Sequence, residues 1–252
     1  MTRIIFNAVF NRTLLHIRRR PVILFLSFLQ PLIWMTFFGF LFQRFPISSD
    51  HGKIQYLDFL LPGICGMTVL LGASQSGISI IRDSQTGFLE RMIITTKQLS
   101  SFVAGKIIAD LFRVIFQAVI VIILGILLGA IVHLNVNTLA SSIFLILFGF
   151  AYCCLSCLIA CKTDSQEAMS AFIHIANMPI FFTSTALVPS KAMPAWMEKL
   201  AEWNPLTMAV TPLRQAMVIQ EPWWNARNFI FLLTICIAIY SALLVSIKEK
   251  RI

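Results

Sequence analysis

Long apolar runs separated by short polar links form the main pattern of this chain. Six runs approach about 20 residues, the length that an α-helix needs to cross the hydrocarbon core of a bilayer. Membrane-spanning barrel strands are shorter and alternate in polarity, so the spans are expected to be helices. We predict an all-α integral membrane protein with one transmembrane domain over 1–252 and six transmembrane helices at 22–42, 57–81, 107–132, 139–161, 168–188 and 228–247.

The composition supports a membrane location. Of the 252 residues, 58% are hydrophobic and 12% are charged, whereas soluble domains are roughly 45–50% apolar and about 25% charged. A net charge of +9 would suggest nucleic-acid binding in a soluble chain, but membrane topology explains it better here. We therefore expect the lipid bilayer, and no nucleic acid, as a partner.

Lysine and arginine are distributed unevenly over the links. With six spans, both termini lie on one side, and the segments on that side carry 13 of the 20 Lys and Arg residues, against 6 on the other side. Because cytoplasmic segments are enriched in Lys and Arg, both termini and the segment 82–106 are predicted to be cytoplasmic.

Two polar segments on the predicted cytoplasmic side have a helical pattern. Residues 1–20 carry five arginines among apolar residues at helical spacing, which predicts a basic amphipathic helix without a signal-peptide cleavage site. In the segment 82–106, Gly87 can end the preceding helix, and the residues after it mix apolar and charged side chains. That segment fits either an amphipathic surface helix or an ordinary loop.

Two further features lie within or between the spans. Asp110, Arg113 and Gln117 share one helical face, which indicates either a structural ion pair or a cluster on which substrate or coupling depends. The long external connection 189–227 contains one short amphipathic helix around Trp196 and an apolar stretch at 206–218. That stretch is too short to cross a bilayer, so it is expected to be re-entrant or interfacial.

The chain lacks the common catalytic motifs. It has no GxxxxGK[ST] phosphate loop, no zinc-protease His-x-x-Glu-His motif and no Gly-x-Ser-x-Gly nucleophile motif. We predict that it is no enzyme by itself. Cys153, Cys157 and Cys161 share a helical face, but no His or acidic residue is interleaved with them, so they are expected to pack rather than to bind metal.

Two separated stretches resemble the membrane subunits of ABC-2 type transporters. The first begins at Leu61 as LPGICG and continues into RDSQTGFLER, and the second reads MPAW, then NPLT, then LR. The N-terminal part is similar to drug-efflux and nodulation-export members. Two departures from the family pattern are Thr185, where Gly is more usual, and Thr96 with Lys97, where Pro is frequent.

The resemblance implies a type V exporter architecture with defined site residues. Residues 1–20 would form the cytoplasmic interface helix, and a coupling helix in 82–106 would seat in the ATPase. The region 189–227 would hold a re-entrant segment. The implied coupling residues are Gly87, Phe88, Leu89, Glu90 and Arg91, and the implied re-entrant motif comprises Asn204, Pro205, Leu206, Thr207 and Arg214.

The implied function is that of a permease subunit in a bacterial inner-membrane exporter. It would pair with a second copy, as a homodimer, and with separate ATP-binding cassette subunits that bind ATP and Mg; this chain itself would hold no cofactor. Its cargo would be hydrophobic or amphipathic, such as a drug, a lipid or a glycan-like molecule. The alternatives are a gradient-driven carrier or channel, and a membrane assembly protein that transports nothing.

Overall fold

The computed structural model describes residues 7–12, 15, 21–42, 47–49, 52–96, 99–163 and 165–249. Almost all of this part of the chain is helical, with one short antiparallel hairpin of two strands. A helical segment covers 7–12. The later elements are α2 (Pro21–Leu41), β1 (Ile47–Ser49), β2 (Gly52–Ile54), α3 (Tyr56–Gln85), α4 (Phe88–Thr96), α5 (Leu99–Leu127), α6 (Val136–Lys162), α7 (Gln166–Phe182), α8 (Ala195–Trp203), α9 (Pro205–Arg214) and α10 (Ala226–Glu249).

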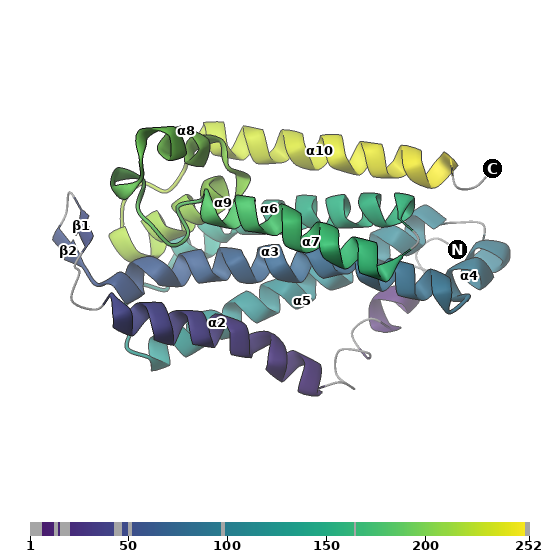
Figure 1. The fold of residues 1–252 in the computed structure, drawn as a ribbon, viewed down its shortest axis with the longest axis horizontal. Coiled ribbons are helices and arrows are strands. Elements are labelled where there is room, and N and C mark those ends of the chain that lie inside the picture. The colour runs from purple at the N-terminus through teal and green to yellow at the C-terminus, as the bar shows by residue number, and fades with distance from the viewer. Residues whose placement is uncertain are drawn as a thin grey trace.

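The helices form an elongated bundle around α3 (Figure 1). Helices α2, α5, α6, α7 and α9 all pack against α3, whereas α10 packs mainly on α6. In the most apolar part of α3, 83% of residues are buried, against 28% in α10. Helix α4 and the last turns of α10 lie at one end of the bundle, which we call the α4 end. The hairpin, α8 and α9 lie at the opposite end, which we call the α8 end.

Within the described residues, four helices are long and apolar enough to cross a membrane: α3, α5, α6 and α10. A shorter apolar stretch covers Phe28–Leu41 of α2. The chain is therefore a helical membrane protein. The two remaining predicted spans, 22–42 and 168–188, coincide with α2 and, in part, with α7.

Helix α7 is shorter than the predicted run, because it ends at Phe182 instead of continuing to 188. The Thr183 hydroxyl donates to the Pro179 carbonyl, and the Asn204 side-chain amide donates to the carbonyl of Ile180. The Pro179 carbonyl also keeps its helical bond from the Thr183 N–H, whereas the Asn204 amide replaces the N–H that a continuing helix would have supplied to Ile180. A turn of buried residues follows, in which Ser184, Thr185 and Ala186 pack against α3 and α9.

Glycine allows α3 to approach its neighbours closely. A Cβ atom at position 63 would collide with the carbonyl oxygen of Ala186, and one at position 77 would collide with the carbonyl oxygen of Ser156 on α6. Small residues permit this close contact of α3 with the backbones of α6 and of the turn after α7, and such packing is one source of helix association inside lipid.

We predict that Gly63→Ala destabilises the protein, because its new methyl group would meet backbone, which cannot rotate away. Overpacking of this kind costs about 1–3 kcal/mol. Gly39→Ala is the control, since its Cβ would meet only the Leu57 side chain, at 2.9 Å from the nearest methyl group. Thermal melting in detergent micelles should show a clearly lower midpoint for Gly63→Ala only; equal midpoints would contradict the packing described.

Candidate functional site

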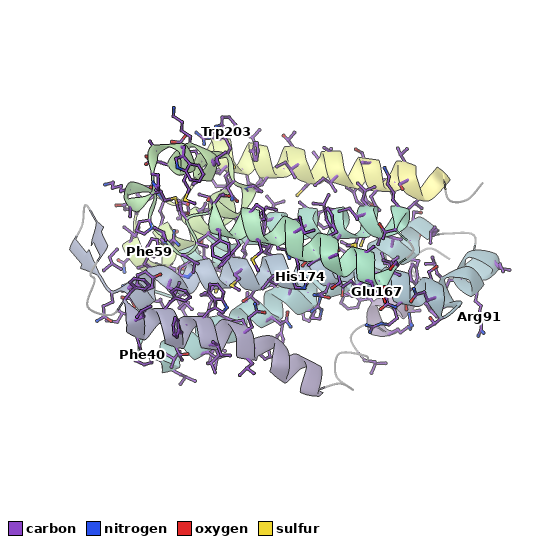
Figure 2. The ribbon with its side chains drawn as sticks, in the orientation of Figure 1. Phe40, Phe59, Arg91, Glu167, His174 and Trp203 are labelled. Atoms are coloured by element: carbon purple, nitrogen blue, oxygen red, sulfur yellow. The ribbon has the colours of Figure 1, made fainter. Side chains whose placement is uncertain are left out.

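The turn between α3 and α4 depends on Gly87. Its φ of 67° lies in the left-handed region, which glycine adopts without strain, so the chain can reverse directly into α4. Phe88, Leu89 and Met92 then pack against the core of the bundle. The other face of α4 is outside the bundle, where Ile94 is 78% exposed. Figure 2 shows Arg91 at the tip of the molecule, with its side chain directed away from the bundle.

A buried carboxylate, Asp83, fixes the base of α4. Its two oxygens accept from the Lys106 ammonium on α5 and from the Arg12 guanidinium of the 7–12 segment, each at 3.0 Å. Arg12 also lies 3.7 Å from the centre of the Phe88 ring on α4. The side chains of Asp83 and Lys106 are 11% and 7% exposed. One acid therefore ties α3, α5 and the N-terminal segment together beside the first residue of α4.

The predicted intramembrane cluster faces α3. Asp110 accepts a hydrogen bond of 2.8 Å from the Ser76 hydroxyl and lies 3.7 Å from the Arg113 guanidinium. Arg113 donates to the backbone carbonyl of Gly72 at 3.0 Å. Gln117 is buried beside the same glycine. The spacing along α5 thus brings all three predicted residues to one helix contact.

A second polar chain connects α6, α7 and α3. The Tyr152 hydroxyl donates to the Asn177 side chain, whose amide donates to the Ser74 hydroxyl at 3.1 Å. The Ser156 hydroxyl donates to the Ser74 carbonyl and accepts from the backbone N–H of Gly77 at 2.9 Å. Together with the Asp110 cluster, these groups form a polar seam along the glycine- and serine-rich half of α3.

At the α8 end, the predicted re-entrant motif holds three segments together. The Asn204 side chain accepts from the Leu206 N–H and so caps α9. Its amide donates to the Ile180 carbonyl and to the Thr183 hydroxyl, both at the end of α7. The Thr207 hydroxyl accepts from the Thr185 N–H at 3.1 Å. Pro205 occupies the first turn of α9, where its missing N–H costs nothing.

Arg214 is buried, with 6% of its surface exposed, at the end of α9. It donates to the backbone carbonyls of Phe59, at 3.1 Å, and Thr185, at 2.8 Å, and its guanidinium lies 3.8 Å from the centre of the Phe59 ring. The planar guanidinium fits this stacked, multiply bonded position, which an ammonium could not fill.

Thr185 replaces the usual glycine without needing a left-handed backbone, because Gln220 is the only described non-glycine residue with a positive φ. The Thr185 hydroxyl is buried and has no hydrogen-bond partner among the described residues. The substitution is thus accommodated by the backbone but leaves one polar atom unsatisfied.

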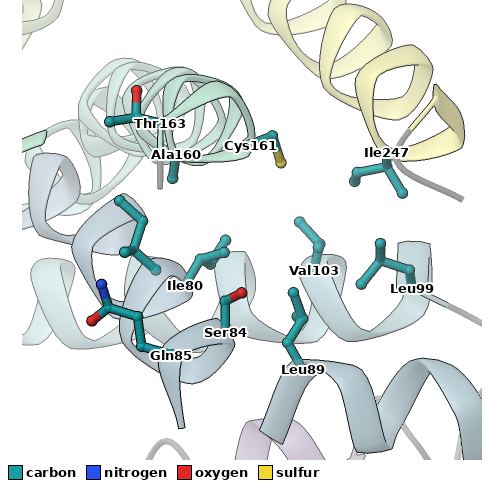
Figure 3. A pocket seen from close by; sticks show the side chains of 11 residues that line it. Ile80, Ser84, Gln85, Leu89, Leu99, Val103, Ala160, Cys161, Thr163 and Ile247 are labelled. Carbon is teal, nitrogen blue, oxygen red and sulfur yellow. The ribbon is translucent and has the colours of Figure 1, made fainter. Parts of the chain in front are cut away.

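A cavity of about 180 Å³ lies at the α4 end. Figure 3 shows its walls, which come from the ends of α3, α5, α6 and α10 and from Leu89 on α4. Most of its lining is aliphatic, with Ser84, Gln85 and Thr163 as polar members. The cavity adjoins the first turn of α4, so the contact between α4 and the bundle is not fully packed.

No group of His, Cys, Asp or Glu in the described parts of the chain could hold a metal ion. Cys153, Cys154 and Cys157 are buried between helices.

A family model described as ABC-2 type transporter matches residues 5–218. The chain belongs to the ABC-2 type transporter family. The transport permease ycf38 of Porphyra purpurea is 30% identical over 224 residues, which cover 87% of this chain and 75% of that protein. The ycf38 permease of Cyanophora paradoxa is 29% identical over 206 residues, 81% and 71% of the two chains.

A bacterial relative points in the same direction. The daunorubicin resistance ABC transporter permease protein DrrB1 of Streptomyces coeruleorubidus is 25% identical over 241 residues, 95% of this chain and 84% of that protein. The resemblance stated from the sequence motifs is confirmed. Membership in this family makes the chain a membrane permease and implies a partnership with an ATP-binding subunit.

Sequence reasoning about this ABC-2 permease missed Asp83, counted Lys106 only as a charge of the segment 82–106, and placed Arg214 in the implied re-entrant motif without a bonding partner. Both basic residues are buried and bonded. Leaving Lys106 and Arg214 out of the Lys and Arg count does not change which side of the membrane carries the excess of positive charge. No local signal identifies Asp83, because its partners lie 23 and 71 residues away. Two sequence signals point to the second polar chain: Asn177 interrupts an apolar run, and residues 72–79 are unusually small and polar for a span.

We predict that Lys106→Met destabilises the permease far more than Arg12→Met does. Removing Lys106 leaves a buried carboxylate with only the half-exposed Arg12, and breaking a buried pair costs about 3–5 kcal/mol. Adding Asp83→Asn to Lys106→Met should recover part of the loss, because no buried charge then remains. Thermal melting of the unaltered protein, the two single variants and the double variant checks this order of stability. Equal melting midpoints for Arg12→Met and Lys106→Met would contradict it.

We predict that Arg214→Lys destabilises the α8 end. Lysine keeps the charge but loses the stacked contact with Phe59 and at least one carbonyl bond, and a hydrogen bond to a charged group contributes about 1.5–3 kcal/mol. Arg227→Lys is the matched control on an exposed arginine. Hydrogen exchange should rise in α9 and in 183–188 for Arg214→Lys alone. Unchanged exchange there would show that Arg214 does not hold this junction.

Proposed function

We propose that this chain is the permease subunit of an ATP-driven exporter. It would work as a homodimer in a bacterial inner membrane, with two ATP-binding cassette subunits on the cytoplasmic side that bind ATP and Mg. The observation that carries this proposal is the placement of α4. It is a short helix beyond the ends of the spans, with one face packed on the bundle and an apolar residue, Ile94, exposed on the other.

The α4 end has the features that a coupling site needs. The base of α4 is held by Phe88 and Leu89, and the Asp83 contacts connect it to α3 and α5. A force applied to α4 by a partner would therefore act on two membrane-spanning helices. In this proposal Gly87, Phe88, Leu89, Glu90 and Arg91 form the coupling segment; the Glu90 side chain lies outside the described part of the structure.

In the proposed topology, α2, α3, α5, α6, α7 and α10 cross the membrane, both termini are cytoplasmic, and α9 enters the membrane from the external side. Helix α9 has ten residues and continues into a π-helical turn of five, Gln215–Ile219, which together are still shorter than the run of about 20 residues needed to cross. Its bonds to the end of α7 and to α3 support this position, because they satisfy its polar groups within the protein, as the membrane interior requires.

A hydrophobic or amphipathic cargo fits the proposal best. DrrB1 is a daunorubicin resistance permease by name, which supports multidrug efflux as the physiological role. The polar seam on α3, with Asp110, Arg113 and Gln117, is the candidate for the group that responds to cargo or coupling. Asp110, Arg113 and Asn177 in this seam are each bonded to α3, so a change in helix packing would change these bonds.

A gradient-driven carrier is the second candidate, because Asp110, buried beside Arg113, is an ionisable residue within a span. Transport that persists without any ATPase and is lost in Asp110→Asn would favour it.

We predict that Ile94→Asp and Glu90→Lys abolish ATP-dependent export while the protein still folds. The spacing of four residues places positions 90 and 94 on one face of α4, so Ile94→Asp adds a charge and Glu90→Lys reverses one on the proposed ATPase-facing side. Glu202→Lys on α8 is the matched control at the opposite end. Two readouts apply: co-purification of an ATP-binding cassette protein from gentle detergent, and ATP-dependent uptake of daunorubicin, as probe, into inside-out vesicles.

The expected result is loss of both readouts in the α4 variants, with unchanged elution on size exclusion and full activity in the control. Normal uptake by both α4 variants would remove this helix from the coupling mechanism. Recovery of the permease alone, even after crosslinking, would favour the gradient-driven candidate.

A further inference from the structure

Helix α8 carries an apolar stripe that faces out of the protein. Trp196, Leu200 and Trp203 are 62%, 52% and 59% exposed. Their spacings of four and three residues place them on one face of the helix. On the opposite side, Ala201 is buried, and α8 packs against α9. Two tryptophans and a leucine exposed side by side form a surface that water alone would not favour.

The stripe joins the exposed apolar face of α10. The Trp203 ring lies 6.0 Å from the Phe231 ring, and Figure 2 shows Trp203 beside the start of α10. Helix α10 is a candidate membrane span whose Ile230 and Ile237 are exposed, so this face is the part of the helix that lipid covers. The surface that begins on α10 thus continues onto α8.

Polar groups hold α8 at the level where this span begins. The Arg227 guanidinium donates to the Glu202 carbonyl at 3.1 Å and lies 5.3 Å from the centre of the Trp203 ring. Lys199 and Glu202 are exposed on the flank of the stripe. An apolar stripe with charged flanks, parallel to the boundary between lipid and water, is the pattern of an interfacial helix. Tryptophan is enriched at that depth, and Trp223 and Trp224 precede α10 by only a few residues.

We propose that α8 lies in the bilayer interface, with Trp196, Leu200 and Trp203 inserted among the lipids of the leaflet at the α8 end. Glu198, Lys199 and Glu202 on α8 and Arg227 beside it carry two negative and two positive charges, so the contact does not require anionic lipid. Asn204 follows directly and is bonded to Ile180 and Thr183 while it caps α9. The depth of α8 in the leaflet thereby fixes the depth of the α7–α9 junction.

Nitroxide labelling of neighbouring positions tests this contact. Cys161 is the one cysteine that is not fully buried, so the background is Cys161→Ser in the full chain. Leu200→Cys carries the label in the stripe, and Lys199→Cys carries it on the flank as the matched control. Both are reconstituted in phosphatidylcholine nanodiscs, and collision rates with oxygen, which enters lipid, and with a water-soluble nickel chelate are measured.

The expected ratio of oxygen to nickel collisions is several-fold higher at position 200 than at position 199. Nickel access at position 200 equal to that at 199 would overturn the proposal in favour of a water-exposed loop. A label at 200 that neither reagent reaches, with a disulfide between copies of Leu200→Cys, would overturn it in favour of a second copy of this chain.

A measurement without labels covers the case in which these variants do not fold. Brominated phosphatidylcholine should quench the tryptophan fluorescence of the unaltered protein, and W196F/W203F should lose a large part of the quenched signal. An unchanged quenched fraction in W196F/W203F would also overturn the proposal. None of these readouts depends on ATPase coupling, so they fail or succeed independently of the proposed function.

Discussion

The burial of α3 on nearly every side is the constraint on which the rest of this structure depends. Lipid tails are as apolar as leucine, so helices inside a membrane associate through close packing and hydrogen bonds rather than through exclusion of water. Gly63 and Gly77 remove the side chains that would keep the α7–α9 turn and α6 away from this helix. Both ends of the molecule are then attached to α3, through Asp83 beside α4 and through the carbonyl of Phe59 beside α9. Any displacement of α4 acts on a helix that is held along its whole length.

Polar groups in the interior follow the same constraint. An unpaired charge or amide in a medium without water is costly, so each one has to find a partner inside the protein. Arg214 uses backbone carbonyls as well as an aromatic ring, Asp110 uses a hydroxyl and an arginine, and Asn177 uses a tyrosine and a serine. Each set joins segments from different helices. These hydrogen bonds therefore offset the cost of burying the polar groups, and they also determine how the helices are placed against one another.

The two ends of the bundle present different surfaces. At the α4 end, a short helix exposes Arg91 and Ile94 beyond the spans, next to a partly empty apolar cavity. Such a surface suits a protein partner that binds α4 and shifts it relative to the cavity. At the α8 end, tryptophans and leucine are exposed beside a lipid-facing span, and the side chains of Asn204 and Arg214 are bonded within the protein. This difference between the ends agrees with the two proposals above, in which a partner protein binds the α4 end and lipid surrounds the α8 end.

The sequence by itself determined the kind of protein and the faces of its helices. Apolar runs of spanning length must be helical in lipid, and α6 and α10 contain the predicted runs 139–161 and 228–247. Helical spacing alone placed Asp110, Arg113 and Gln117 on one face, and two short motifs identified the family. Only the tertiary structure decided the partners. Asp83 meets Lys106 and Arg12, Asn177 meets Tyr152 and Ser74, and Arg214 meets Phe59 across 155 residues. Local spacing fixes the direction of a side chain on its own helix, whereas the group that it meets depends on how separate helices pack, and no local pattern encodes that packing.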